Sequence, residues 1–199
     1  MIRLLDIFFS LLGLLILLPV FIILYIAIRL ESKGGGFYRQ IRVGKEGKDF
    51  GLYKFRSMRV GADKKGLITV GGRDPRITKV GYFIRKYKLD ELPQLFNVIK
   101  GDMSLVGPRP EVRKYVDLYT DEQRKVLSVR PGITDYASIE YVSENEILAQ
   151  SNNPEKTYIE EVLPDKIKYN MKYIESQSVR EYFKVIFLTF YRIIKPKDK

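Results

Sequence analysis

The 199-residue sequence contains no cysteine and no histidine. These absences exclude a disulfide scaffold, a thiolate nucleophile, an imidazole base and the usual zinc sites, which are built from Cys or His. Any catalysis must therefore use carboxylates, Lys, Ser, Thr or Tyr. A catalytic metal should be a hard, oxygen-binding cation such as Mg²⁺, held by Asp or Glu with help from the substrate.

Positive charge is in excess, with 35 Lys and Arg against 24 Asp and Glu and a formal net charge of +11. This balance favours partners that carry phosphate or present a membrane surface. Nucleic acid is not an expected partner, because the basic residues are scattered and no recognised binding module is present. A Walker-type phosphate loop is also missing. The length suits one catalytic domain.

The first thirty residues contain a long uncharged run, from Ile7 to Ile28. At roughly 22 residues it is long enough to cross a bilayer as a helix. It is longer than the apolar core of a secretory signal, and no small-residue cleavage site follows it. We therefore expect a membrane-bound protein.

Pro19 lies near the middle of this run. It removes an amide donor and its ring clashes with the carbonyl of Leu15, so the helix should bend there. A bent helix can span the membrane or enter and leave by one face, and basic residues at both ends of the run leave both topologies open. The cluster Gly34 to Gly36 then separates a membrane-associated segment, residues 1–33, from a cytoplasmic-face catalytic domain, residues 34–199.

The catalytic domain reads as α+β and mostly helical, with one small β-hairpin. The expected hairpin pairs residues 37–43 with 50–56, and residues 61–74 form a loop. Two helices are expected over residues 79–100, the second beginning around Asp90 and ending at Gly101. Further helical stretches are predicted at residues 111–129, after Asn153, and at 179–194. The last is amphipathic, and it fits either the membrane interface or the domain core.

Asp90 and Glu91 are the candidate catalytic carboxylates. At a helix N-terminus the free amides and the dipole favour anions, so a carboxylate stays ionised there and a phosphate is welcome. An ionised carboxylate needs no general base to attack phosphorus. One could attack while the other holds a metal. The alternative is that Asp90 is simply an N-cap.

Two arginines lie in turns stiffened by proline. Arg109 stands between Pro108 and Pro110, and Arg130 precedes Pro131. Such residues are well placed to bind phosphate oxygens with two parallel hydrogen bonds. Either arginine could instead pin its loop to a surface carboxylate.

The run KLDELPQLFNVIKGDMSLVGPRP, residues 88–110, resembles the bacterial sugar transferase family, the monotopic phosphoglycosyl transferases that start membrane glycoconjugate assembly. The segments YKFRSM at 53–58 and RPGIT at 130–134 support the resemblance. With the apolar N-terminus it covers most of the chain, in the family's minimal, purely catalytic form.

The resemblance implies transfer of a phosphosugar from a UDP-sugar to polyprenyl (undecaprenyl) phosphate, with release of UMP, at the cytoplasmic face of the cell inner membrane. The family's nucleophile falls on Asp90, its Mg²⁺ ligand on Glu91, and its basic site positions on Lys54, Arg85 and Arg109. The family's membrane segment is re-entrant and bent at a proline, which favours re-entry at Pro19.

The sequence departs from the family pattern at two places. Leu18 stands where a Ser often precedes the proline. After RPGIT, the familiar Gly-(Trp/Leu)-Ala-Gln-Val-Asn-Gly-Arg is replaced by residues 135–142, so that a phosphate-binding Arg falls on Val142. Arg130 is a candidate to replace it. These departures leave one alternative, a catalytically silent membrane scaffold acting beside such enzymes.

Overall fold

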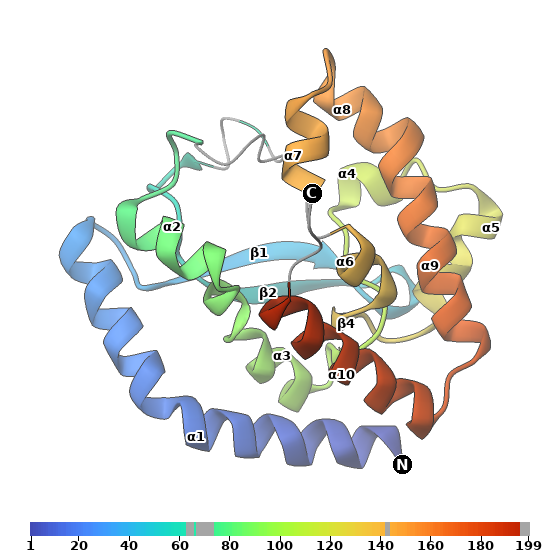
Figure 1. The fold of residues 1–199 in the computed structure, drawn as a ribbon, viewed down its shortest axis with the longest axis horizontal. Helices are drawn as coiled ribbons and strands as arrows, with labels where there is room; N and C mark the ends of the chain where they lie inside the picture. Colours follow the sequence, from blue (N-terminus) through green and yellow to red (C-terminus); the bar gives the residue numbers. More distant parts are fainter. Residues whose placement is uncertain (63–65, 67–73, 142–143, 196–199) are drawn as a thin grey trace.

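Helix α1 (Ile2–Glu31) carries the long apolar run. The structure is a computed structural model that describes residues 1–62, 66, 74–141 and 144–195. Pro19 lies inside α1, and Figure 1 shows the helix bending partway along its length, as expected for an internal proline. The helix is long and apolar enough to cross a membrane, and most of its large side chains are exposed.

The predicted hairpin is confirmed. Strands β1 (Phe37–Val43) and β2 (Asp49–Phe55) pair in antiparallel register, with Tyr38 opposite Lys54, and a 3₁₀ turn (Lys45–Gly47) joins them. A short parallel pair, β3 (Ser104–Val106) and β4 (Gly132–Thr134), forms a second sheet. The predicted loop at 61–74 lies mostly outside the described residues.

The other regular elements of the described chain are helices and helical turns, which confirms the α+β class. They are α2 (Lys79–Lys86), the 3₁₀ turn η3 (Leu89–Glu91), α3 (Gln94–Lys100), α4 (Arg113–Val116), α5 (Asp121–Arg124), the 3₁₀ turn η4 (Lys125–Ser128), α6 (Tyr136–Glu140), α7 (Glu144–Ala149), α8 (Pro154–Thr157), the π-helical turn η5 (Tyr158–Val162), α9 (Leu163–Glu175) and α10 (Val179–Ile194).

One predicted helix is wrong. The stretch 111–129 is not continuous but forms α4, α5 and η4. Thr120 explains the break: its hydroxyl accepts from the Gln123 amide, and the Gln123 side chain accepts from the Thr120 amide. This capping box starts a new helix within the predicted one.

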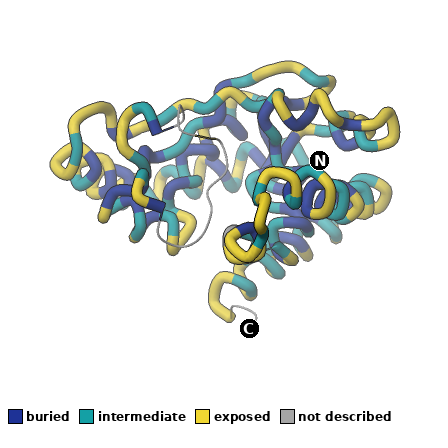
Figure 2. The backbone as a smooth tube through the Cα atoms, turned by 90° about the horizontal axis from the view of Figure 1, so that it is seen from above, coloured by how far each residue is buried: buried dark blue, intermediate teal, exposed yellow. Residues whose placement is uncertain are grey.

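The hydrophobic core is divided among several clusters. Phe21, Leu24 and Ile28 of α1 pack with Phe55 of β2 and Ile84 of α2. A larger cluster joins the hairpin end to α4, η5 and α9. Helix α10 packs on α6, β3 and β4 through one face, and Figure 2 shows exposed residues in its last turns, near the C-terminus. The hairpin thus lies between α1 and the C-terminal helices (Figure 1).

Candidate active site

Asp90 lies in the 3₁₀ turn η3, not at the start of an α-helix. Helix α3 begins at Gln94, so the predicted start around Asp90 is wrong by four residues, whereas its end at Gly101, in the left-handed region with φ 95°, is confirmed. Pro93, with φ −63°, is the N-cap of α3 and separates this helix from η3. The chain tightens into i→i−3 hydrogen bonds before α3.

The side chain of Glu91 meets two cations from distant parts of the chain. Both terminal nitrogens of Arg109 contact its carboxylate, Nη1 at 3.2 Å from Oε2 and Nη2 at closer range to Oε1. Lys54 Nζ lies 3.5 Å from Oε1. The structure therefore brings together three of the residues that the sequence selected.

Lys54 reaches this position because β2 is tied to α3. The side chain of Asn97, which is fully buried, donates to the Gly51 carbonyl at 2.8 Å and accepts from the Tyr53 amide at 2.9 Å. These two hydrogen bonds fix the strand beside the turn that carries the carboxylates. Asn97 is a supporting residue that the sequence reasoning did not select.

The two adjacent carboxyl groups have opposite pKa shifts. Burial raises the pKa of Asp90, and the neighbouring Glu91 carboxylate raises it further. Burial also acts to raise the pKa of Glu91, but the charges of Arg109 and Lys54 outweigh it and hold that pKa well below its ordinary value. Glu91 is thus firmly ionised, while Asp90 is a desolvated carboxylate whose negative charge is less well compensated.

The cations of the site are affected by the same burial. Burial lowers the pKa of Lys54 to about 8, although Glu91 opposes the shift. Arg85 lies in the last turn of α2, and its charge, like that of Lys88, acts to lower the pKa of Asp90. Lys88 was not selected from the sequence, although it lies only two residues before Asp90. In the structure it is the N-cap of η3 and has a left-handed backbone with φ 56°.

Arg109 stands on a loop that a partly buried ion pair supports. Arg42 donates to the Pro110 carbonyl at 3.1 Å and to Glu111 at 2.9 Å. Glu111 also accepts from the hydroxyl of Tyr158. Hydrophobic periodicity placed Glu111 at the start of a predicted helix. The sequence therefore did not indicate its contacts with Arg42 and Tyr158.

Arg130 lies near the end of α3 and not beside the two carboxylates. Its Nε donates to the Gly101 carbonyl at 2.9 Å, and it lines a separate hollow together with Arg3, Lys45 and Ser128. The structure does not bring it together with Asp90 and Glu91. Val142, the other position of interest after RPGIT, lies outside the described residues.

The carboxylates fit a magnesium ion that takes most of its ligands from a substrate. Mg²⁺ commonly uses one or two protein carboxylates and completes its octahedron with phosphate oxygens and water. No group of three or more acidic side chains suited to a metal gathers in the described chain. Glu91 stays ionised and is therefore the better metal ligand of the two carboxylates. Arg109 contacts both of its oxygens, so a metal ion would compete with this guanidinium for them.

The site can therefore bind and polarise a phosphate ester. It combines a buried carboxylate able to attack, an ionised carboxylate able to hold a cation, and a set of basic side chains for phosphate oxygens. These groups come from β2, α2, η3 and the loop after β3.

Comparison with known proteins places the chain in a family. The family model described as bacterial sugar transferase matches residues 1–196, so the chain belongs to that family. This confirms the resemblance seen in the sequence.

Several relatives carry more specific names. The chain is 51% identical over 120 residues to a putative undecaprenyl-phosphate N-acetylgalactosaminyl 1-phosphate transferase of Bacillus subtilis, covering 60% of this chain and 67% of that protein. It is 36% identical over 190 residues to the UDP-glucose:undecaprenyl-phosphate glucose-1-phosphate transferase of Escherichia coli, covering 94% of this chain and 39% of that protein. It is 40% identical over 198 residues to the galactosyl transferase CpsE of Streptococcus agalactiae, covering 94% of this chain and 40% of the other. The chain thus spans about two fifths of the length of the last two relatives.

Proposed function

We propose that the protein transfers a sugar 1-phosphate from a UDP-sugar to undecaprenyl phosphate and releases UMP, as the first membrane step of glycoconjugate synthesis. The observation that carries the proposal is the placement of buried Asp90 beside Glu91, which Arg109 and Lys54 hold ionised. The names of the relatives supply the donor and acceptor classes.

The reaction takes place in two displacements at one phosphorus atom. A carboxylate oxygen of Asp90 attacks the β-phosphorus of the UDP-sugar, and the bond from that phosphorus to the bridging oxygen breaks. UMP leaves with the bridging oxygen and its electron pair. A phosphate oxygen of undecaprenyl phosphate then attacks the aspartyl phosphosugar, which restores the Asp90 carboxylate and yields undecaprenyl-diphosphate-sugar.

The surrounding cations have a clear task in this scheme. Negative charge builds on the phosphate oxygens as each bond forms and breaks, and preorganised Lys and Arg side chains stabilise it. Lys54, Arg85 and Arg109 fill this role, and Arg130 remains a candidate for a more distant part of the substrate. A Mg²⁺ held by Glu91 would supply further charge neutralisation at the diphosphate.

Contacts at both ends of α1 favour the re-entrant topology. At one end, Arg3 donates to the carbonyls of Val98 and Ile99 at 2.6 and 3.0 Å. At the other, Glu31 accepts from the amides of Lys79 and Val80 at 2.6 and 2.9 Å. A straight helix of this length would separate its ends by about 45 Å. Because both ends contact the same domain, the helix should enter and leave the bilayer by the cytoplasmic face.

Helix α10 extends the surface proposed to meet lipid. It buries Tyr182 and Val185 against the domain and exposes Phe187, Phe190 and Ile194. The sequence left core packing and interface binding as alternatives, and the two faces of the helix accommodate both. Aromatic and aliphatic side chains of this kind suit the headgroup region of a phospholipid bilayer.

The decisive experiment incubates membranes containing the protein with undecaprenyl phosphate, Mg²⁺ and a panel of UDP-sugars, and measures UMP. We expect release with at least one donor and none from Asp90→Asn. UMP release that persists in Asp90→Asn would overturn the covalent role. No release from the wild type with any donor would favour the silent scaffold instead.

Topology has its own experiment, which the cysteine-free sequence makes simple. Single cysteines are placed near residue 2 and in the segment 34–36, and sealed vesicles are labelled from each side. Re-entry predicts that both react from the same side. Labelling from opposite sides would show that α1 spans the bilayer.

A further inference from the structure

Backbone hydrogen bonds lock the loop that carries Arg109 to the segment that follows Arg130. Gly107 N donates to the Thr134 carbonyl at 3.0 Å, and Gly132 N donates to the Pro108 carbonyl at 2.9 Å. The two glycines approach so closely that a Cβ on Gly132 would lie 2.1 Å from the nitrogen of Gly107. The position of one loop therefore determines the position of the other.

A buried carboxylate completes this connection. Asp135 is 1% exposed, and one of its oxygens accepts from the main-chain N–H of Arg109 at 2.9 Å. Its other oxygen accepts from the amide of Ser138 at 2.5 Å and so caps α6. The Asp135 carboxylate thus links the N-terminus of α6 to the main chain of Arg109 by hydrogen bonds.

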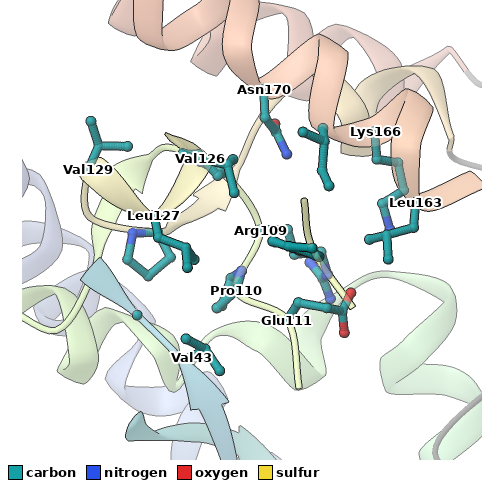
Figure 3. A pocket seen from close by; sticks show the side chains of 15 residues that line it. Val43, Arg109, Pro110, Glu111, Val126, Leu127, Val129, Leu163, Lys166 and Asn170 are labelled. Carbon is teal, nitrogen blue, oxygen red and sulfur yellow. The ribbon is translucent and has the colours of Figure 1, made fainter. Parts of the chain in front are cut away.

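The side of the loop that faces α9 is not completely filled by side chains. A cavity of about 30 Å³ lies there, lined by Arg109, Glu111, Lys166 and Asn170 among others. Figure 3 shows Glu111 and Arg109 on one side of this cavity and the α9 residues Lys166 and Asn170 on the other. The hydrogen bond from Asp135 therefore holds the main chain of Arg109 on the side away from this cavity.

We propose that Asp135 is a positioning residue that holds Arg109 where its guanidinium reaches Glu91 and the phosphates of the substrate. The proposal rests on the function proposed above. Asp135 directly follows the RPGIT segment, so the carboxylate lies on the strand side of α6 that faces the Arg109 loop. The RPGIT segment has a related role, because its backbone is hydrogen-bonded to the loop that carries Arg109.

The test is a double-mutant cycle on the rate of UMP release, with Asp135→Ser, Arg109→Lys and the double variant in membranes. Serine is a good N-cap, so Asp135→Ser keeps the bond that starts α6 and loses the one to Arg109. We expect kcat/KM to fall about tenfold for Asp135→Ser alone, since a small displacement of a catalytic group is costly. In the Arg109→Lys background the same change should cost less than about twofold, because residues that act through one another are not additive.

A matched control removes a different helix cap, that of α8. Asn153→Ala deletes the hydrogen bond that the Lys156 amide donates to the Asn153 side chain at 3.1 Å, and it should leave kcat/KM unchanged. Asp135→Asn, which keeps the size of the side chain and one acceptor, serves as a second variant if Asp135→Ser does not fold.

The outcomes separate the two proposals. An equal loss from the Asp135 change in both backgrounds, or no loss at all, would overturn the positioning role while leaving the transferase intact. A wild-type protein that releases no UMP from any UDP-sugar would overturn the proposed function, and the role of Asp135 with it.

Discussion

Arg109 binds Glu91 through both terminal nitrogens of its guanidinium, across 18 residues of sequence. The contact joins a loop after β3 to the turn η3 and places a cation beside two adjacent carboxyl groups. It also raises the pKa of Arg109 further above its ordinary value, because the Glu91 charge favours the protonated form. This pair is the electrostatic centre of the proposed active site.

Removing Arg109 should reduce activity strongly. We expect Arg109→Ala to lower the rate of UMP release by about 10²–10³-fold, the effect seen when one preorganised charge-stabilising donor is lost. Arg113→Ala is the matched control, since Arg113 forms an exposed ion pair with Asp49. A similar loss in both variants would mean that general destabilisation, not the chemistry, is responsible.

Removing the same guanidinium should strengthen magnesium binding in the absence of substrate. Arg109 and Mg²⁺ would compete for the oxygens of Glu91, so we expect Arg109→Ala to bind Mg²⁺ several-fold more tightly by titration calorimetry. Glu91→Gln should bind it more weakly than the wild type. An affinity that is the same in the wild type and in both variants would argue against Glu91 as the metal ligand.

The sequence predicted the β-hairpin and the end of α3 correctly, because both depend on neighbouring residues alone. The hairpin followed from alternation around a Gly-Lys turn, and Gly101 correctly ended α3. The start of α3 was missed because Pro93 was counted as a first-turn residue, whereas it is the N-cap of α3 and the residues before it form the 3₁₀ turn η3. The 111–129 prediction failed because periodicity outweighed the capping box at Thr120.

The candidate site was predictable as a set of residues but not as an arrangement. The motif around Asp90 and Glu91 identified the acids, and the prolines identified Arg109. Nothing in the spacing shows that Arg109 contacts Glu91 or that Asp135 holds the Arg109 amide, because both contacts depend on how separate loops pack. Arg130 looked equivalent to Arg109 in sequence, yet the fold turns it toward the end of α3.

Asp90→Asn should abolish turnover and raise stability. The folded-state pKa of Asp90 is raised, so burying its ionised form costs stability at neutral pH, and this cost disappears as the pH falls through that pKa. We expect Asp90→Asn to have a higher Tm than the wild type at pH 7.5. The increase should shrink toward pH 4. Asp117→Asn is the control, since Asp117 is exposed, and it should leave Tm unchanged at pH 7.5 and at pH 4.

The pH dependence of kcat/KM should show an alkaline limb due to Lys54. Its pKa is about 8, so the ammonium loses its proton as the pH rises through that value, and a phosphate ligand is lost. We expect kcat/KM to fall between pH 8 and 10. Lys54→Arg stays charged over this range and should flatten the limb, even if its absolute rate is lower. An identical limb in Lys54→Arg would assign the titration to another group.

Lipid contact by α10 can be measured directly, because the sequence contains no tryptophan. Phe187 is 70% exposed on α10, whereas Leu118, 55% exposed, lies between α4 and α5. Each is replaced by Trp in an otherwise unchanged chain reconstituted with brominated phospholipids. Phe187→Trp should emit at shorter wavelength and be quenched by the bromine, because an aromatic ring at the interface lies near the acyl chains. Leu118→Trp should show neither effect, and quenching of both to the same extent would mean that α10 has no special relation to the bilayer.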